Sequence, residues 1–118
     1  MKAALLISHG SRSAKTKKEV ETLVEKLKSL SGFKIFEYAF LEIEEPDIPK
    51  GIDLCAKKGA REIMVLLNFL NSGRHVDCDI PRIVAEARER YPSIHFSISK
   101  PVGQHPRIPE LFKDLLNL

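Results

Sequence analysis

Residues 2–12 read KAALLISHGSR, an apolar run followed at once by a polar turn. The run Lys2–Ser8 is short and continuously apolar, which predicts a strand buried on both faces, as strands of parallel sheets are. His9 and Gly10 follow where this strand ends, and glycine allows a tight turn that leaves the imidazole exposed over the sheet edge. The stretch therefore predicts both the kind of sheet and the place where polar side chains gather.

The rest of the chain alternates between helical and strand-like segments. Apolar residues recur at helical spacing from Val20 to Leu30, with Ser11 or Ser13 as the cap and Gly32 as the end. We further predict strands at 33–40, 61–67 and 93–99, helices at 47–58, 79–91 and 109–118, and loops at 68–78 and 100–106. Strands separated by single helices run parallel through right-handed crossovers. We expect an α/β fold of one domain, 1–118, with a four-stranded parallel sheet flanked by helices on both faces.

Composition and charge narrow the function. The chain has 19 Lys and Arg against 16 Asp and Glu, a net charge of +3, with no basic run of the kind that binds nucleic acid. This charge suits an anionic small-molecule substrate. No apolar run approaches the length of about 20 residues that spans a membrane, and no signal peptide is recognisable, so we expect a cytoplasmic protein. Cys55 and Cys78 form no CxxC pair, and we expect both to be small core residues.

Several common catalytic motifs are absent. The sequence has no GxxxxGK[ST], GxGxxG, GxSxG or HExxH pattern. Their absence argues against nucleotide-dependent phosphoryl transfer and dinucleotide chemistry.

Polar residues follow each predicted strand, and in an open parallel sheet ligands bind outside the carboxyl ends of the strands. His9 follows the first strand, Glu42, Glu44 and Glu45 the second, Asn68, Asn71, Arg74 and His75 the third, and His105 the fourth. Taken together, His9 and His75 with carboxylates nearby resemble a transition-metal site of imidazole and oxygen ligands. Glu42 is closest to a strand end and is the better choice for proton transfer.

Each of these residues has a plainer interpretation. Either loop histidine alone can simply form local hydrogen bonds, and Glu45 before Pro46 suits the start of a helix. Arg12, Arg74 and Arg107 are solvated surface charges or carboxylate binders. His95, inside a predicted strand, is read as structural.

The combined motifs resemble a known family over essentially the whole chain. The stretches that carry the resemblance are Ser8–Arg12, Phe40–Glu42 with Glu45–Pro46, Phe69–Leu70, Gly73–His75, Asp79–Pro81 and Pro101–Pro106. They are similar to the small form of the class II tetrapyrrole chelatases, the sirohydrochlorin cobaltochelatase family with its nickel-chelatase relatives. Asn68 stands where many relatives have proline, and the histidine-rich tract of some relatives is absent.

The resemblance implies a fold equal to one half of the two-domain class II chelatases, and roles for particular residues. His9 and His75 match the metal-binding histidines, and Glu42 matches the glutamate that helps to remove pyrrole protons. The residues expected to contact the tetrapyrrole are Ser11, Arg12, Phe69, Leu70, Arg74 and His105.

The implied reaction is insertion of a divalent metal into sirohydrochlorin, without ATP, for cobalamin or a related tetrapyrrole. Co²⁺ is the first choice and Ni²⁺ the second, and no cofactor beyond the substrate metal is expected. One alternative is a sirohydrochlorin ferrochelatase that uses Fe²⁺. Another is a histidine-based metal carrier, which would need no Glu42. Phosphoryl transfer through His9 is disfavoured because Ser8 stands where phosphatases of that kind place an arginine.

The short chain also predicts an assembly. One four-stranded sheet has one exposed carboxyl edge, which does not readily enclose a macrocycle. Two copies related by a two-fold axis, the commonest arrangement of oligomers, would form a cleft between their edges. We therefore expect a homodimer.

Overall fold

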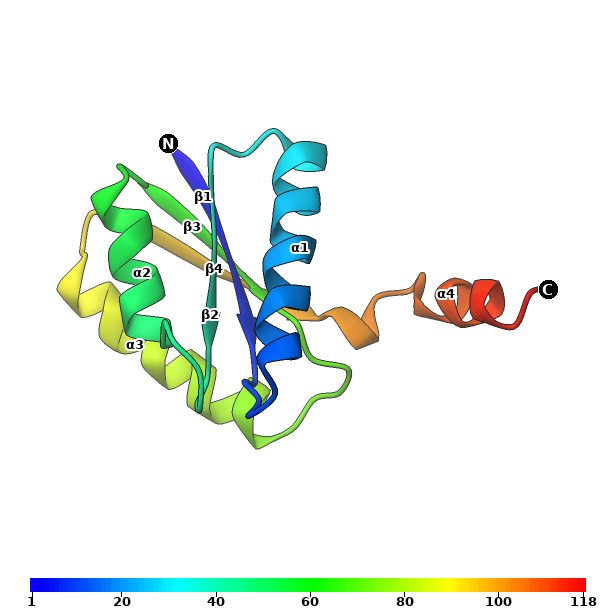
Figure 1. The fold of residues 1–118 in the computed structure, drawn as a ribbon. Helices are drawn as coiled ribbons and strands as arrows, with labels where there is room; N and C mark the ends of the chain where they lie inside the picture. The colour runs from blue at the N-terminus through cyan, green and yellow to red at the C-terminus, as the bar shows by residue number, and fades with distance from the viewer.

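The structure, a computed structural model, describes residues 1–118, and its centre is a four-stranded parallel sheet (Figure 1). The strand order is β2-β1-β3-β4, and all three neighbouring pairs are parallel. The strands are β1 (Lys2–Ser8), β2 (Ile35–Phe40), β3 (Glu62–Leu67) and β4 (His95–Pro101). All but the first residue of β1 are buried, because its two faces are both covered. The predicted α/β fold is confirmed.

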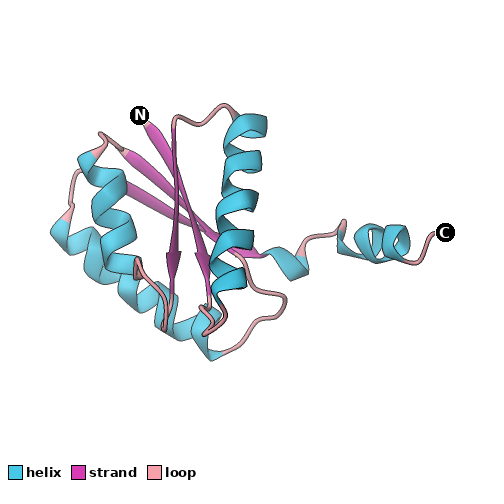
Figure 2. Cartoon of the chain, viewed as in Figure 1, coloured by secondary structure: helices cyan, strands magenta, loops and turns pink.

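Helices cover both faces of the sheet, as predicted, but unequally (Figure 2). The helices are α1 (Ala14–Ser31), α2 (Ile48–Lys57), α3 (Ile80–Arg90) and α4 (Ile108–Leu115), with shorter turns η1 (His75–Asp79) and η2 (Val102–Gln104). α2 and α3 pack on one face and α1 on the other. α4 stands away from the body at the end of the chain.

The face under α2 and α3 holds the larger core. Alternate residues of β1, Ala3, Leu5 and Ile7, point to this side and join Ile52 of α2 and Val84 of α3 in a cluster of 17 buried residues. This alternation follows from the period of two along a strand. This cluster of buried residues packs α2 and α3 against the sheet.

The α1 face is only half covered. Val20 and Val24 of α1 pack over Ala4, Leu6 and the aromatic residues of β2 in a cluster of six buried residues. The half of this face formed by β3 and β4 has no helix over it, and Met64 of β3 stays exposed.

Several predicted boundaries were wrong by a few residues. β2 starts at Ile35 rather than at Phe33, and β4 runs from 95 to 101 rather than from 93 to 99. The loop predicted at 68–78 ends in a helical turn from His75, and the loop predicted at 100–106 contains the end of β4 and a 3₁₀ turn. Polar loop composition concealed these short elements, because sequence patterns locate element ends only to within a few residues.

The two cysteines differ. Cys55 lies in the core of α2, as predicted, and burial raises the pKa of its thiol to about 12, so the thiol stays protonated and is a poor metal ligand. Cys78 is exposed on η1, so its prediction as a core residue was wrong. None of the helices has the length and apolar content needed to cross a bilayer.

Candidate metal and proton-transfer site

The loops after β1 and β2 lie against each other at the carboxyl edge of the sheet. The amide of Leu41 donates to the Ser8 carbonyl at 2.8 Å, and the amide of Glu42 donates to the His9 carbonyl at 3.0 Å. These bonds continue the pairing of the two strands past their ends. They set the side chains of His9 and Glu42 next to each other.

Gly10 permits this close approach. Its φ of +105° is unfavourable for residues with a Cβ, and a Cβ there would lie 1.9 Å from the Glu42 carbonyl oxygen. Any other residue would push the second loop away. Gly10 therefore acts through the backbone and places Glu42 beside His9.

Glu44 and Ile43 complete the second loop. The Glu44 carboxylate accepts a hydrogen bond from the amide of Ser11 at 2.8 Å, which ties the second loop to the first. Ile43 has φ of +73°, an outlier for a β-branched residue. The backbone conformation around Glu42 is thus held by contacts on both sides of it.

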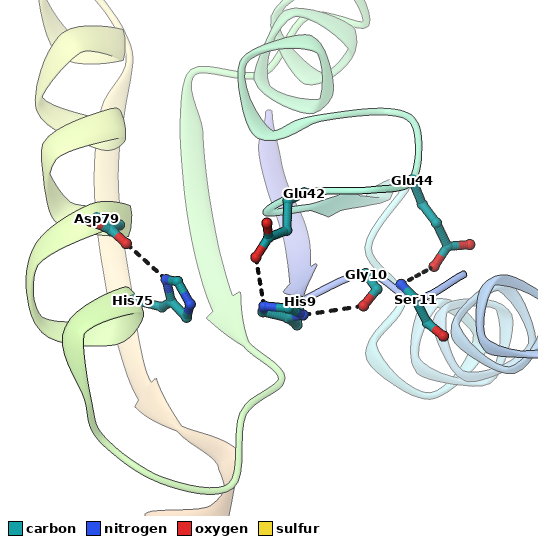
Figure 3. A network of polar contacts seen from close by, with 7 residues as sticks. All are labelled: His9, Gly10, Ser11, Glu42, Glu44, His75 and Asp79. Atoms are coloured by element: carbon teal, nitrogen blue, oxygen red, sulfur yellow. Dashed lines mark hydrogen bonds and ion pairs between the residues drawn. The ribbon is translucent and has the colours of Figure 1, made fainter. Parts of the chain in front are cut away.

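His9 has a hydrogen-bond acceptor on each side of its ring (Figure 3). Its Nε2 lies 2.8 Å from Oε1 of Glu42, and its Nδ1 lies 3.2 Å from the Gly10 carbonyl oxygen. A metal ion that binds Nε2 replaces the contact with Glu42, while Nδ1–H can still donate to the Gly10 carbonyl and orient the ring.

His75 enters the site from η1 at the start of the third helical segment. The amide of Ile80 donates to the His75 carbonyl, which makes the widened π-helical turn. Pro81 has no N–H for the Asp77 carbonyl, and this loss of an α-helical bond suits a widened turn. Asp79 lies four residues after His75, and its Oδ2 is 2.8 Å from His75 Nδ1. That carboxylate can accept a hydrogen bond from Nδ1–H, which leaves Nε2 free to bind an ion.

His9, Glu42 and His75 come together into one group. The two imidazole centroids are 5.3 Å apart, and the three ligand atoms lie within 4.8 Å of one another. Two ligand atoms that bind one ion at right angles, each about 2.1 Å from it, are separated by about 3 Å. The His9 and Glu42 pair already has nearly this spacing at 2.8 Å, and the ligand atom of His75 lies within 4.8 Å of both.

The group is open to solvent. About half of each side chain is exposed: 47% for His9, 52% for Glu42 and 46% for His75. Two imidazoles and one carboxylate, with open positions, suit divalent Fe, Co, Ni or Zn. Such a site can hold an ion and leave positions for a second ligand, and its carboxylate can exchange protons with water.

The remaining predicted residues are spread along the same edge. Ser11 is held through its amide, and Arg12 and Arg74 are exposed beside His9 and His75 in the chain. Phe69 packs against the larger core, whereas Leu70 is 62% exposed. These positions are compatible with contacts to a large ligand above the edge.

His105 lies outside the metal group. Its Nδ1 accepts a hydrogen bond from the amide of Arg107 at 3.0 Å, and its side chain lines a groove beside α1. His95 is the first residue of β4 and pairs with Glu62 at the opposite end of the sheet. The structure therefore brings together two of the four histidines.

Glu44 and Asp79 have positioning roles that sequence reasoning missed. The sequence presents Glu44 only as one of three acids after a predicted strand, and nothing in it pairs Glu44 with the Ser11 amide. It presents Asp79 only as the first residue of a predicted helix. Its spacing of four from His75 is the signal that would have found it, had a helical turn been predicted from residue 75.

Known proteins resemble this chain over most of its length. The family model CbiX matches residues 3–117. A sirohydrochlorin ferrochelatase of Arabidopsis thaliana, described as chloroplastic, is 33% identical over 110 residues, which are 93% of this chain and 49% of that protein. A sirohydrochlorin cobaltochelatase of Methanocaldococcus jannaschii is 38% identical over 84 residues, which are 71% of this chain and 59% of that protein.

A solved structure extends the likeness to the fold. The sirohydrochlorin chelatase SirB of Bacillus subtilis subspecies spizizenii, in complex with cobalt, aligns with a TM-score of 0.88 and 34% identity over 99% of this chain and 50% of SirB. The chain spans less than half the length of the first curated relatives that it matches. Because the family model covers nearly every residue and the relatives agree with it, the chain belongs to the CbiX family.

Proposed function

We propose that this chain inserts a divalent metal ion into sirohydrochlorin. The observation that carries the proposal is the meeting of His9, Glu42 and His75 at the carboxyl edge of the sheet, within 4.8 Å. Relatives named as sirohydrochlorin chelatases, and a cobalt complex of one of them, support the same chemistry. We also propose that residues 1–118 act as one chelatase domain.

The two histidines bind the metal before transfer. Their Nε2 atoms are neutral ligands that hold a divalent ion and release it more readily than thiolates would. Asp79 orients the ring of His75, the Gly10 carbonyl orients the ring of His9, and the ligand atoms of the two rings lie within 4.8 Å of each other. The open positions of the ion face the tetrapyrrole.

Glu42 accepts protons from the tetrapyrrole. Insertion of M²⁺ releases two pyrrole N–H protons, and the four ring nitrogens then bind the ion in place of the histidines. Glu42 takes these protons in turn and passes them to water, because half of its side chain is exposed. Each proton thus moves from a pyrrole nitrogen to a Glu42 oxygen and then to solvent.

The flanking residues orient the anionic macrocycle. Arg12 and Arg74 are exposed, three residues and one residue along the chain from His9 and His75, and pair with carboxylate groups on the rim of the tetrapyrrole. Leu70 and Phe69 offer apolar contacts to the ring, and Ser11 and His105 offer polar ones. The net charge of +3 favours the approach of such a substrate.

For the metal, we propose Co²⁺ first and Ni²⁺ second, which places the product in cobalamin or related tetrapyrrole synthesis. Relatives carry both cobaltochelatase and ferrochelatase names, so Fe²⁺ is the alternative substrate. The affinity of imidazole sites rises in the order Fe²⁺, Co²⁺, Ni²⁺. The supply of each metal ion therefore decides which one is inserted. No ATP and no further cofactor takes part in this proposal.

We further propose that two copies form the working enzyme. The metal group lies on one open sheet edge, with about half of each side chain in solvent. A second copy would supply the opposite wall around the macrocycle and exclude water from the ion.

The test is anaerobic incubation with sirohydrochlorin and Co²⁺, Ni²⁺ or Fe²⁺ in separate reactions, followed by the absorption change. We expect acceleration over the spontaneous rate, lost in His9→Ala and in His75→Ala. His95→Ala is the matched control, because His95 is exposed at the other end of the sheet, and it should keep the full rate.

Two outcomes would contradict the proposal. No acceleration with any of the three metals would exclude a chelatase. Metal binding that depends on His9 and His75, without any acceleration, would instead indicate a metal carrier.

A further inference from the structure

Helix α4 has an apolar face that nothing in its own chain covers. Leu111, Phe112, Leu115 and Leu116 are 54%, 55%, 78% and 67% exposed, and no residue of the helix is buried. A helix of eight residues is too short to be stable in water without packing. In Figure 1 the helix stands clear of the body, so its stability depends on a surface elsewhere.

A groove of matching character lies on the half-covered face of the sheet. It consists of two adjoining hollows of about 480 and 320 Å³ between α1 and the β3–β4 half of the sheet. Both are lined by Leu27 of α1 and Leu66 of β3. Leu23 extends the lining at one end, and Leu30, Phe33 and Met64 extend it at the other. The walls are mostly apolar, and no element of the chain fills the groove.

The exposed area also exceeds what a compact chain would show. The chain exposes 7824 Å², whereas a compact protein of 13.3 kDa exposes about 6,450 Å². The surplus is about 1,400 Å² per chain, or about 2,800 Å² for two chains. Obligate homodimers bury more than about 2,000 Å² in total, so the surplus is large enough for a stable interface. The radius of gyration, 14.5 Å, is likewise larger than the value of about 13.5 Å for a compact chain of this length.

The chain leaves β4 in a direction that carries α4 away from its own groove. The amide of Gly103 donates to the Phe69 carbonyl at 3.0 Å, and the Gln104 side-chain amide donates to the Leu70 carbonyl at 3.0 Å. A Cβ on Gly103 would lie 1.8 Å from that Leu70 oxygen, so the two segments are in the closest contact that glycine allows. Pro106 and Pro109 then restrict the backbone between this anchor and the helix.

We propose that two copies of this chain exchange their C-terminal helices, with α4 of each copy seated in the groove between α1 and β3–β4 of the other. The exchange is reciprocal, so each copy covers the open half of the sheet in its partner. It supplies the contact that holds two chains together. The proposal needs no metal and no tetrapyrrole, and its test is independent of the proposed reaction.

The first experiment is sedimentation equilibrium of the full chain over a range of concentrations. We expect twice the 13.3 kDa mass. Leu115→Glu, at a position 78% exposed within one chain, leaves the fold of each chain intact and weakens the dimer by a factor of at least about ten. Lys113→Glu, on the other side of α4, is the matched control and should keep the dimer. A monomeric wild type, or equal dimer affinity of Leu115→Glu and wild type, would overturn the proposal.

The second experiment separates exchange between chains from folding back within one chain. In a Cys78→Ser background, one variant carries Leu115→Cys in α4, and two others carry Lys100→Cys or Met64→Cys at the groove. We expect disulfide-linked heterodimers when the α4 variant is mixed with a groove variant and oxidised. A link that forms only within one chain, in a variant carrying both cysteines, would overturn exchange, as would failure of both mixtures to link.

Discussion

Neighbouring groups orient the two imidazoles of the site in different ways. The His9 ring lies between two acceptors, Glu42 and the Gly10 carbonyl. A metal ion at Nε2 replaces the contact with Glu42 and leaves the contact at Nδ1 in place. His75 differs, because its Nδ1 contacts the Asp79 carboxylate and no protein group is hydrogen-bonded to its Nε2. A metal ion therefore displaces a contact of His9 but none of His75.

Replacing Glu42 tests proton transfer at the residue scale. Glu42→Gln keeps the shape and an acceptor oxygen for His9 but removes the carboxylate that takes pyrrole protons. We expect the insertion rate at saturating Co²⁺ to fall by about 10² to 10⁴. Glu45→Gln on the same loop is the control, because Glu45 pairs at the surface with Lys50. A rate for Glu42→Gln equal to the control rate would contradict the role of Glu42.

Replacing Asp79 tests the support of His75. Asp79→Asn removes the charge that fixes the ring, so we expect Co²⁺ affinity to fall by about 10-fold to 100-fold. Isothermal titration with Co²⁺ alone measures this without any tetrapyrrole. Asp77→Asn on the same turn should bind as wild type does, and equal affinities for both variants would rule out positioning by Asp79.

At the scale of elements, two loops from neighbouring strands act as one unit. Backbone bonds extend the β1 and β2 pairing to His9 and Glu42, and Glu44 holds the Ser11 amide on the far side. The site therefore depends on the closeness of the loops as much as on its ligand side chains.

Gly10→Ala tests that closeness. The new Cβ would combine an unfavourable φ with overlap of the Glu42 carbonyl, so we expect a loss of about 2 to 5 kcal/mol in the free energy of unfolding. Gly32→Ala has a similar left-handed φ with open space around it, and should lose only about 1 to 2 kcal/mol. Urea unfolding of both variants gives the comparison, and equal losses would mean that loop contact adds nothing.

At the scale of the whole molecule, one chain leaves its surface incomplete. The open half of the α1 face and the apolar face of α4 are both exposed, and each suits the other. An exchanged dimer resolves both features at once.

Thermal unfolding gives a prediction at this scale. If two chains exchange α4, the midpoint Tm rises with protein concentration, because unfolding then includes dissociation. Scanning calorimetry over a 100-fold range of concentration should show this rise for wild type and for Lys113→Glu, and a flat Tm for Leu115→Glu. A wild-type Tm that does not change with concentration would speak against an obligate dimer.

Much of the fold could be predicted from short-range pattern. Strand β1 corresponds to the apolar run Lys2–Ser8. Helix α1 corresponds to the helical spacing from Val20 to Leu30 and ends at Gly32. The reason is that periodicity records which face is buried, whatever the partner. Short elements such as η1 could not be predicted, because a single turn has too few residues to show a period.

The sequence by itself determined the parallel sheet, its carboxyl edge, and the presence of His9, Glu42 and His75 on that edge. Only the tertiary structure decided that these three meet, that Asp79 and Glu44 support them, and that Cys78 and α4 are exposed. The physical reason is distance along the chain. Contacts between loops depend on strand order and backbone register, which no local pattern contains. An apolar helix face likewise indicates that the helix packs against another surface, but not which surface.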